Sequence, residues 1–394
     1  MPLPIIALFI TAFAFGTTEF VIAGILPQLA EGLGVSVPAA GYLVSGYALA
    51  IAIGGPVLTL LTTAVPRKTL LIGLSLVFVA GQLACALAPG FASMLLFRVI
   101  VAGAHGVYFG VAMVVAIGLV PPERRGMAVA VVLAGLTVSN IVGVPIGAAI
   151  GNAFGWRATF WAMFGLGILT LAAILALLPN QKGPRAEPPH LSQEIGVLGR
   201  QQVWTTIIVM LMLMMCQYVP FTYISPFLPE VTRLDASTIP WVLLINGLGA
   251  TLGVYLGGRL ADWKLMPSLI ALLLVQSVVA ALLYLLSPWP IAMVILVPLW
   301  GCINFSIGTP LQTRILSWTA DAPNLASSLI PAGFNLGIAI AAFVGGLIIT
   351  SGLGYRALPL VGVVSMLIAA AVAARSWSVE KQSGALPPLR TAEA

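Results

Sequence analysis

Three ionisable side chains, Glu19, Arg98 and His105, lie within long apolar stretches of a 394-residue chain in which only 7% of the residues are charged. Glu19 is set in FGTTEFVIAG, residues 15–24, and it alone among eleven acidic residues falls well inside such a stretch. An ionised side chain at the centre of a bilayer costs about 3 kcal/mol on insertion scales, so its presence there indicates a function. Reversible binding of a proton is the chemistry that this position favours.

The spacing of these three residues predicts that they meet at one depth. Counting about 1.5 Å per helical residue from Pro4 puts Glu19 about 22 Å from one membrane face. Arg98, counted from Ala92 in a helix that runs the other way, comes to about 21 Å from the same face. His105 follows Arg98 by two helical turns and shares its helix face. We therefore predict a proton relay, while two plainer interpretations stay open: a static Glu19–Arg98 ion pair, and a hydrogen-bonded packing role for His105.

The elements that position these residues are predicted to be membrane-spanning helices. Hydrophobic residues make up 60% of the chain, which excludes an ordinary water-soluble fold. The apolar runs lack the alternation of a β-barrel, so helices are the remaining way to satisfy the backbone in lipid. We predict an all-α polytopic membrane protein with twelve spans, at residues 4–30, 40–63, 69–88, 92–118, 127–151, 157–178, 203–228, 240–260, 267–287, 290–315, 325–350 and 354–375.

The basic residues predict the orientation. With the N-terminus in the cytoplasm, thirteen of seventeen Lys and Arg residues lie at the cytoplasmic side, which is the positive-inside pattern: Arg67, Lys68, Arg124, Arg125, Lys182, Arg185, Arg200, Arg259, Lys264, Arg314, Arg375, Lys381 and Arg390. Both termini are then cytoplasmic. The opening MPLPIIALFI lacks a basic signal-peptide region, so we expect the first span to be retained in a multi-pass inner (plasma) membrane protein.

A polar interruption at residues 179–202 divides the spans six and six. Sliding the second half back by 199 positions aligns Pro27 with Pro226, Gly54 with Gly253 and Gly147 with Gly346, which indicates a duplicated six-helix unit. We predict an N-terminal bundle at 1–178, a cytoplasmic linker at 179–202, a C-terminal bundle at 203–376 and a cytoplasmic tail at 377–394. Internal repeats of this kind are typical of secondary transporters, which bind their substrate between the halves.

The same offset aligns Glu19 with Tyr218 and His105 with Asn304, so the second half carries neutral hydrogen-bonding groups where the first carries titratable ones. We expect proton handling in the first half and substrate contacts that include the second. An interhelical hydrogen bond is an equally good interpretation for each candidate. The candidate substrate-cavity residues are Asn140, Gln217, Tyr218, Phe221, Tyr223, Asn246, Asn304, Phe334 and Asn335.

Small residues recur every four positions in the fifth span. Gly143, Gly147 and Gly151 predict one smooth helix face on which a neighbour packs closely. Pro145 frees a backbone carbonyl in mid-span and permits a bend. Close packing alone accounts for most of this pattern.

Four motifs then resemble the major facilitator superfamily, in particular its twelve-helix drug:proton antiporters, which include exporters of chloramphenicol, sugars and purine nucleosides. They are TTEF at 17–20 with GILPQLA after it, RVIVAGAHG at 98–106, GVPIGAAIG at 143–151 and GGRLAD at 257–262. The resemblance extends over about residues 4–375. It implies two six-helix bundles that alternate access, with the arginine of the second motif in proton coupling and the glycines and proline of the third at the interface between the halves.

The resemblance also implies a cytoplasmic gating motif, formed here by Gly258, Arg259 and Asp262 in one half and by Arg67 and Lys68 in the other. The first copy departs from the family pattern, because Thr63 and Ala64 stand where an acid and a base are expected. The N-terminal copy of this latch is therefore in doubt, and Asp262 is expected to carry more of it.

We therefore expect a proton-coupled exporter of a small organic molecule, with protons as the coupling ion, no other cofactor and no metal. An importer or facilitator of the same architecture is the main alternative. A membrane enzyme has little support, because the sequence has no nucleophile elbow and no metal-ligand spacing. A channel is disfavoured by the lack of a filter-like loop. The expected partners are the lipid bilayer and a neutral or weakly polar substrate, without nucleic acid, and a monomer suffices for the mechanism.

Overall fold

The protein is described by a computed structural model that covers residues 2–179 and 196–384. Within these ranges the chain forms helices and turns and contains no β-strand, so the predicted all-α fold is confirmed. The elements are α1 (Leu3–Phe20), η1 (Val21–Gly24), α2 (Leu26–Gly32), α3 (Val37–Leu49), η2 (Ala50–Gly54), α4 (Gly55–Leu61), α5 (Arg67–Ala86), α6 (Phe91–Gly118), η3 (Pro122–Arg124), α7 (Arg125–Val138), η4 (Ser139–Gly143), α8 (Val144–Phe154), α9 (Trp156–Leu177), η5 (Gly196–Gly199), α11 (Gln201–Thr222), α12 (Ile224–Phe227), η6 (Leu228–Thr232), η7 (Ala236–Thr238), α13 (Ile239–Leu286), α14 (Pro290–Trp318), α15 (Pro323–Thr350), η8 (Tyr355–Ala357) and α16 (Leu358–Ser383).

Eleven helical segments of the described residues are long and apolar enough to cross a membrane, where the sequence predicts twelve spans. The difference lies in α13, which covers both predicted spans at 240–260 and 267–287 and belongs to a candidate span of 51 residues. A straight helix of that length measures about 75 Å, more than twice the hydrocarbon thickness of about 30 Å. The backbone of Lys264 is non-helical, with φ −153° and ψ 90°, and Pro267 follows it. The count of twelve, like the orientation of the termini, stays a prediction.

Prolines interrupt several of the predicted spans because a proline has no N–H to donate within the helix. The first predicted span divides into α1, the 3₁₀ segment η1 and α2, which begins one residue before Pro27. Two π-helical segments, η2 and η4, likewise precede Pro56 and Pro145. The last span is longer than predicted, since α16 continues to Ser383. Most of the predicted linker, 180–195, and the end of the predicted tail, 385–394, lie outside the described residues.

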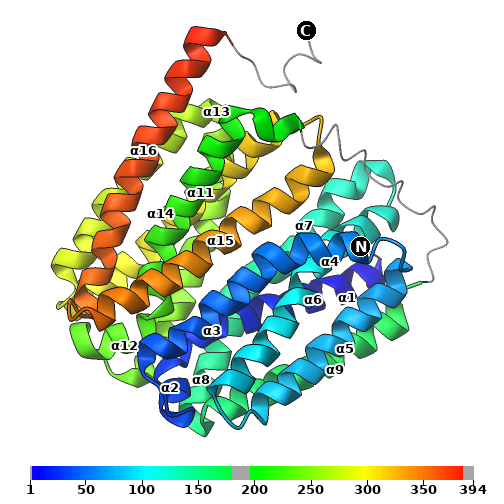
Figure 1. Ribbon diagram of the computed structural model, residues 1–394, viewed down its shortest axis with the longest axis horizontal. Coiled ribbons are helices and arrows are strands. Elements are labelled where there is room, and N and C mark those ends of the chain that lie inside the picture. The colour runs from blue at the N-terminus through cyan, green and yellow to red at the C-terminus, as the bar shows by residue number, and fades with distance from the viewer. Residues whose placement is uncertain (1, 180–195, 385–394) are drawn as a thin grey trace. The chain divides into compact units, whose positions relative to one another are not determined.

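The chain divides into two compact units. Unit 1 comprises Met1–Glu187 and two short later segments, Ile224–Pro226 and Asp235–Leu244, so it takes in residues beyond the predicted boundary at 178. Within it, α1 packs against α7 and α9, and α5 lies beside α6 and α9 (Figure 1). A cluster of buried aliphatic and aromatic side chains forms its core, and polar side chains such as Glu19, Arg98 and His105 are buried in the same unit.

Unit 2 comprises Pro188–Tyr223, Phe227–Leu234 and Ile245–Ala394. Here α11 packs against α14, α15 and α16, the yellow, orange and red helices of Figure 1. Three glycines of α13 permit close approach to α14, because a Cβ atom built on each would lie 2.1–2.4 Å from a backbone carbonyl oxygen of that helix; they are Gly249, Gly253 and Gly257. Such contacts exclude any larger residue unless the helices separate.

Candidate functional site

Glu19 lies in the last turn of α1 with only 7% of its surface exposed. Its nearest ionic partner is His105 of α6, with 3.8 Å between Glu19 Oε2 and His105 Nε2. This separation is longer than a hydrogen bond, for which about 2.9 Å is usual, so the two groups are neighbours that a small side-chain rotation brings into contact.

His105 is 3% exposed and is held by neighbours on three helices. Its Nδ1 atom is hydrogen-bonded to the hydroxyl of Tyr47 on α3 at 3.0 Å. Phe15 of α1 stacks on the imidazole with 5.1 Å between ring centroids, and Phe109 of α6 packs at 5.3 Å. The imidazole therefore has one nitrogen bonded to a hydroxyl and the other directed towards a carboxyl group.

Arg98 of α6 is 1% exposed, yet its bonds go mainly to backbone oxygens. Its Nε donates to Leu43 O of α3 at 3.1 Å and its Nη1 to Thr18 O of α1 at 3.2 Å. The last carbonyls of a helix lack full intrahelical partners, which makes Thr18 O available at the end of α1. The guanidinium also lies over the ring of Tyr47, 4.5 Å from its centroid. Its Nη2 atom is buried without a hydrogen-bond partner.

The three predicted side chains are thus brought together, but the static Glu19–Arg98 ion pair, the plainer interpretation that the sequence left open, is not formed within 4 Å in this structure. In the described part of the chain, the carboxylate of Glu19 pairs within 4 Å only with His105. Arg98 is oriented instead by carbonyl oxygens on two neighbouring helices, those of Leu43 and Thr18. Its charge is left without a bonded carboxylate, so the local charge balance depends on whether Glu19 carries a proton.

Tyr47 is the residue of this cluster that the sequence interpretation missed. It contacts both His105 and Arg98 and is 1% exposed. Tyr42 lies in the same span, and nothing in the spacing of the two tyrosines distinguishes the one that faces α6. The distinction depends on the rotation of α3 about its axis, which neighbouring helices set.

The glycines of the fifth span pack against the first helix of the same unit. A Cβ atom built at each would lie 2.1–2.4 Å from a side chain of α1, of η1 or of the residue that follows η1; the pairs are Gly143 with Thr17, Gly147 with Val21 and Gly151 with Ile25. Pro145 is buried directly after the π-helical segment η4. The glycines therefore hold the helix that carries Glu19. The role at the interface between the halves, which the family resemblance implies, stays a prediction.

Four predicted cavity residues donate hydrogen bonds to the backbone. Tyr223, in the turn after α11, donates to Ala342 O of α15 at 2.8 Å, and Asn246 of α13 donates to Val297 O of α14 at 2.9 Å. Asn140 and Asn335 each donate to the carbonyl four residues earlier; these are Leu136 O at 3.2 Å and Pro331 O at 3.1 Å. For Tyr223 and Asn246 the geometry favours a structural hydrogen bond between chain segments over contact with a substrate.

Other predicted cavity residues keep unused hydrogen-bonding capacity. The amide oxygens of Gln217, Asn304 and Asn335 are buried and have no hydrogen-bond partner. Such atoms cost free energy unless water or a ligand satisfies them. The ring of Phe221 packs against Tyr218 at 5.7 Å and against Trp300 at 6.4 Å. Phe334 is half-buried on α15.

The predicted gating residues lie at helix ends or on exposed surface. Arg67 and Lys68 begin α5 and are half-buried. On α13, Gly258 has open space beside it, Arg259 lies over the ring of Tyr255 at 4.9 Å, and Asp262 is exposed. Their gating roles stay predictions.

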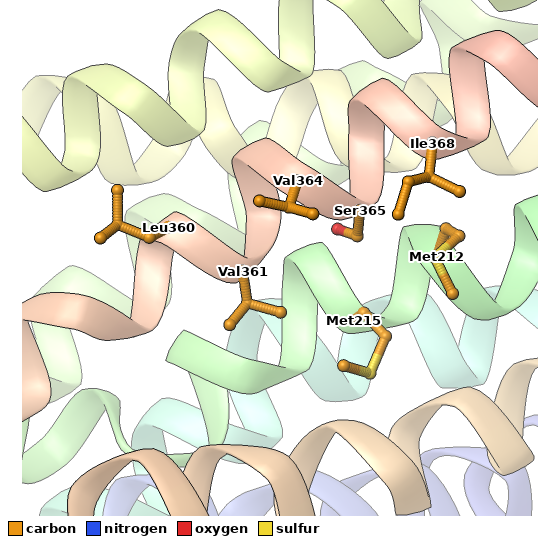
Figure 2. Close-up of a pocket in the computed structure, with 7 residues that line it drawn as sticks. All are labelled: Met212, Met215, Leu360, Val361, Val364, Ser365 and Ile368. Atoms are coloured by element: carbon orange, nitrogen blue, oxygen red, sulfur yellow. The ribbon is translucent and has the colours of Figure 1, made fainter. Parts of the chain in front are cut away.

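An apolar groove of about 370 Å³ lies between α11 and α16 of unit 2 (Figure 2). None of the predicted cavity residues lines it. Three of its α16 side chains, Leu360, Val364 and Ile368, are exposed, as expected of a face in contact with hydrocarbon. The groove is lined by Met212, Met215, Leu360, Val361, Val364, Ser365 and Ile368.

In the described ranges, no three His, Cys, Asp or Glu side chains lie close enough together to hold a metal ion. The cysteines Cys85, Cys216 and Cys302 are free and buried. Proton transfer and hydrogen bonding are the chemistry that the cluster around Glu19 provides.

Comparison with known proteins identifies relatives along the chain. The sequence model of the family described as Major Facilitator Superfamily matches residues 8–324. The chain is 37% identical over 361 residues to the inner membrane transport protein YdhP of Escherichia coli K12, which covers 92% of each protein. It is 33% identical over 341 residues to the chloramphenicol resistance protein of Streptomyces lividans, which covers 86% of this chain and 87% of that protein.

Solved structures share the fold at low sequence identity. A bacterial homologue of the human lysosomal transporter Spinster, inward-facing and unoccupied, matches with a TM-score of 0.74 and 18% identity over 94% of this chain and 95% of its own. The peptide transporter POT in complex with sulfate matches with a TM-score of 0.74 and 16% identity over 95% of both chains. The eleven candidate spans and the similarity to the inner membrane transport protein YdhP confirm the predicted multi-pass inner-membrane location.

Proposed function

Because the chain belongs to the major facilitator superfamily of membrane transporters, we propose that it exports a small uncharged organic molecule in exchange for protons. The observation that carries this proposal is the buried carboxyl group of Glu19 in a membrane-spanning helix, 3.8 Å from His105 and not bonded to Arg98. A carboxylate that is not held in a fixed ion pair is free to exchange its proton. Likeness to a chloramphenicol resistance protein makes drugs of that type the first substrate class to test.

Protonation of Glu19 changes the charge of the cluster by one unit, because Arg98 stays positive. With Glu19 ionised the cluster is neutral, and with Glu19 protonated it carries a buried positive charge. A low-dielectric interior disfavours such a charge, so the protonated cluster favours a conformation that solvates Arg98. Since a ligand shifts an equilibrium only through its different affinity for two states, proton and substrate must favour opposite states.

The driving force sets the gradient that one proton can support. A membrane potential of 100 mV is worth about 2.3 kcal/mol per charge. A tenfold ratio corresponds to about 1.4 kcal/mol, so one proton exchanged for one neutral molecule sustains about a 50-fold substrate gradient. A larger gradient would require a pH difference across the membrane, a larger potential or a second proton.

The substrate class follows from the groups left to bind it. Three buried amide oxygens without partners, on Gln217, Asn304 and Asn335, accept hydrogen bonds from hydroxyl or amide N–H groups. Acceptors of this kind suit a neutral molecule with several donors better than a multiply charged one. Chloramphenicol, simple sugars and purine nucleosides all meet this description.

The test is proton movement in everted membrane vesicles. Vesicles that contain the protein are acidified inside, and chloramphenicol is added while a pH-sensitive dye reports the interior. An exporter exchanges the drug for internal protons, so the interior becomes less acidic. Sugars and purine nucleosides are tested in the same way.

The matched variants are Glu19→Gln and Glu31→Gln. Both remove one carboxylate, but Glu31 is exposed on α2. We expect Glu19→Gln to abolish substrate-evoked proton release and Glu31→Gln to leave it unchanged. Release that persists in Glu19→Gln refutes the coupling, and inward accumulation of substrate by intact cells identifies an importer instead.

A further inference from the structure

Tyr47 connects the two basic side chains of the Glu19 cluster. Its hydroxyl is 3.0 Å from His105 Nδ1, and its ring carries the guanidinium of Arg98 at 4.5 Å. The side chain is 1% exposed, so its hydroxyl has no access to bulk water. A hydroxyl bonded to one imidazole nitrogen can accept from it or donate to it, so it stabilises either tautomer of the ring.

The other ionisable groups near this pair come from three helices. Glu19 of α1, Arg98 of α6 and Cys85 of α5 interact electrostatically with Tyr47. Tyr108 of α6 is also buried nearby, but its hydroxyl donates to Leu8 O at 2.5 Å and not to His105. Only Tyr47 therefore occupies Nδ1, and only Glu19 faces Nε2 within 4 Å, among the described residues.

When Glu19 is ionised, one arrangement suits Glu19, both ring nitrogens of His105 and the Tyr47 hydroxyl. A carboxylate accepts hydrogen bonds only, so the imidazole proton belongs on Nε2, which faces it. Nδ1 is then an acceptor, and the Tyr47 hydroxyl donates to it. The opposite tautomer would direct the lone pair of Nε2 at a negative charge.

When Glu19 is protonated, a second arrangement becomes available. The carboxylic acid donates to Nε2, the imidazole proton moves to Nδ1, and Nδ1–H donates to the Tyr47 oxygen. The cluster gains one proton in total: Glu19 carries one more than before, while His105 and Tyr47 each still carry one. The hydroxyl makes this possible because it both donates and accepts.

We propose that Tyr47 is a positioning residue that makes the tautomer of His105 follow the protonation of Glu19. Without the hydroxyl, Nδ1–H would be a buried donor with no partner, which costs about 1–3 kcal/mol. The imidazole would then keep its proton on Nε2 in both states. The proposal rests on the proposed function only for its consequence in transport.

Tyr47 links the tautomer of His105 to helix α3. Tyr47 and the carbonyl of Leu43 both lie on α3, and both hold Arg98. A change in the direction of the Tyr47–His105 hydrogen bond therefore acts on the helix that orients the arginine. Loss of the hydroxyl should alter how substrate-evoked proton release depends on pH and leave the fold intact.

The experiment is nitrogen NMR of His105 in the purified, lipid-reconstituted protein with ¹⁵N-labelled histidine. The chain has two histidines, and the second, His190, lies outside the described residues, so His190→Gln leaves a single reporter. Protonated and unprotonated ring nitrogens have well-separated shifts. As the pH is lowered, we expect the Nδ1 signal to move from the unprotonated to the protonated position while the Nε2 signal moves the opposite way, which distinguishes a change of tautomer from formation of an imidazolium.

Tyr47→Phe and Tyr108→Phe are the matched variants, since each removes one buried hydroxyl and keeps its ring. The Nδ1 signal should stay at the unprotonated position in Tyr47→Phe and move as in the parent in Tyr108→Phe. A parent protein whose Nδ1 signal does not move, or a Tyr47→Phe signal that moves normally, overturns the proposal. The spectrum requires no substrate, so failure of the export assay leaves this result independent.

Discussion

Replacement of Gly143 by alanine tests the contact that holds the Glu19 helix. The added Cβ would lie 2.1 Å from Thr17 Oγ1, whereas ordinary contacts begin at about 3.4 Å. Thr17 has little freedom to move away, because it is fully buried and its hydroxyl donates to Phe13 O at 2.8 Å. The helices must therefore shift by about 1.3 Å or strain, and Glu19 is two residues from the contact.

Overpacking of this kind costs about 1–3 kcal/mol. For a large chain each kcal/mol lowers the melting temperature by about 2–4 °C, so we expect Gly143→Ala to melt about 2–12 °C below the parent. Thermal unfolding of the purified protein in one detergent measures this. Substrate-evoked proton release should fall as well, because the separation of Glu19 from His105 changes.

A second substitution should relieve the clash. Thr17→Ala removes the oxygen at 2.1 Å and leaves Thr17 Cβ at 3.1 Å as the nearest atom of that residue, so Thr17→Ala/Gly143→Ala should recover most of the lost stability. Gly165→Ala is the control, because Gly165 is exposed on α9 with no atom within 4 Å of the added Cβ. The reasoning is refuted if Gly143→Ala melts like Gly165→Ala, or if the double variant is no more stable than Gly143→Ala.

Two ion pairs of unit 2 give further predictions. Hydrogen bonds from Arg200 lower the pKa of Asp321. The ion pair therefore stabilises the fold fully above about pH 4, and this stabilisation is lost as the pH falls through the lowered pKa. The difference in melting temperature between the parent and Asp321→Asn should be small at pH 7, shrink in high salt and vanish in acid. Glu380→Ala leaves Arg314, whose side chain is 4% exposed, without its carboxylate partner, and it should lower the free energy of unfolding by about 3–5 kcal/mol. Arg314→Met/Glu380→Ala, which removes both charges, should lower it by less. Equal losses for the two variants in denaturant unfolding would contradict this reasoning.

Helix existence was predictable along this chain because an apolar run of about 20 residues has one stable state in lipid. The break at Lys264 of α13 lies in the gap between the predicted spans at 240–260 and 267–287, so its place follows from the sequence. Interruptions inside a predicted span are harder to foresee. The π-helical segment at 139–143 is one that the sequence analysis does not predict, although Pro145 marks its place.

The sequence by itself determined the membrane-spanning helical class and, through its motifs, the family, and it singled out Glu19, Arg98 and His105 as candidates because each is an ionisable group in an apolar run. Only the tertiary structure decided which partners these side chains have. Arg98 bonds to backbone oxygens, Tyr47 bonds to His105, and Glu19 stays unpaired with the arginine. Hydrogen bonds between helices depend on the rotation and depth of each helix, and those follow from packing across contacts such as Gly143 with Thr17, which no local pattern encodes.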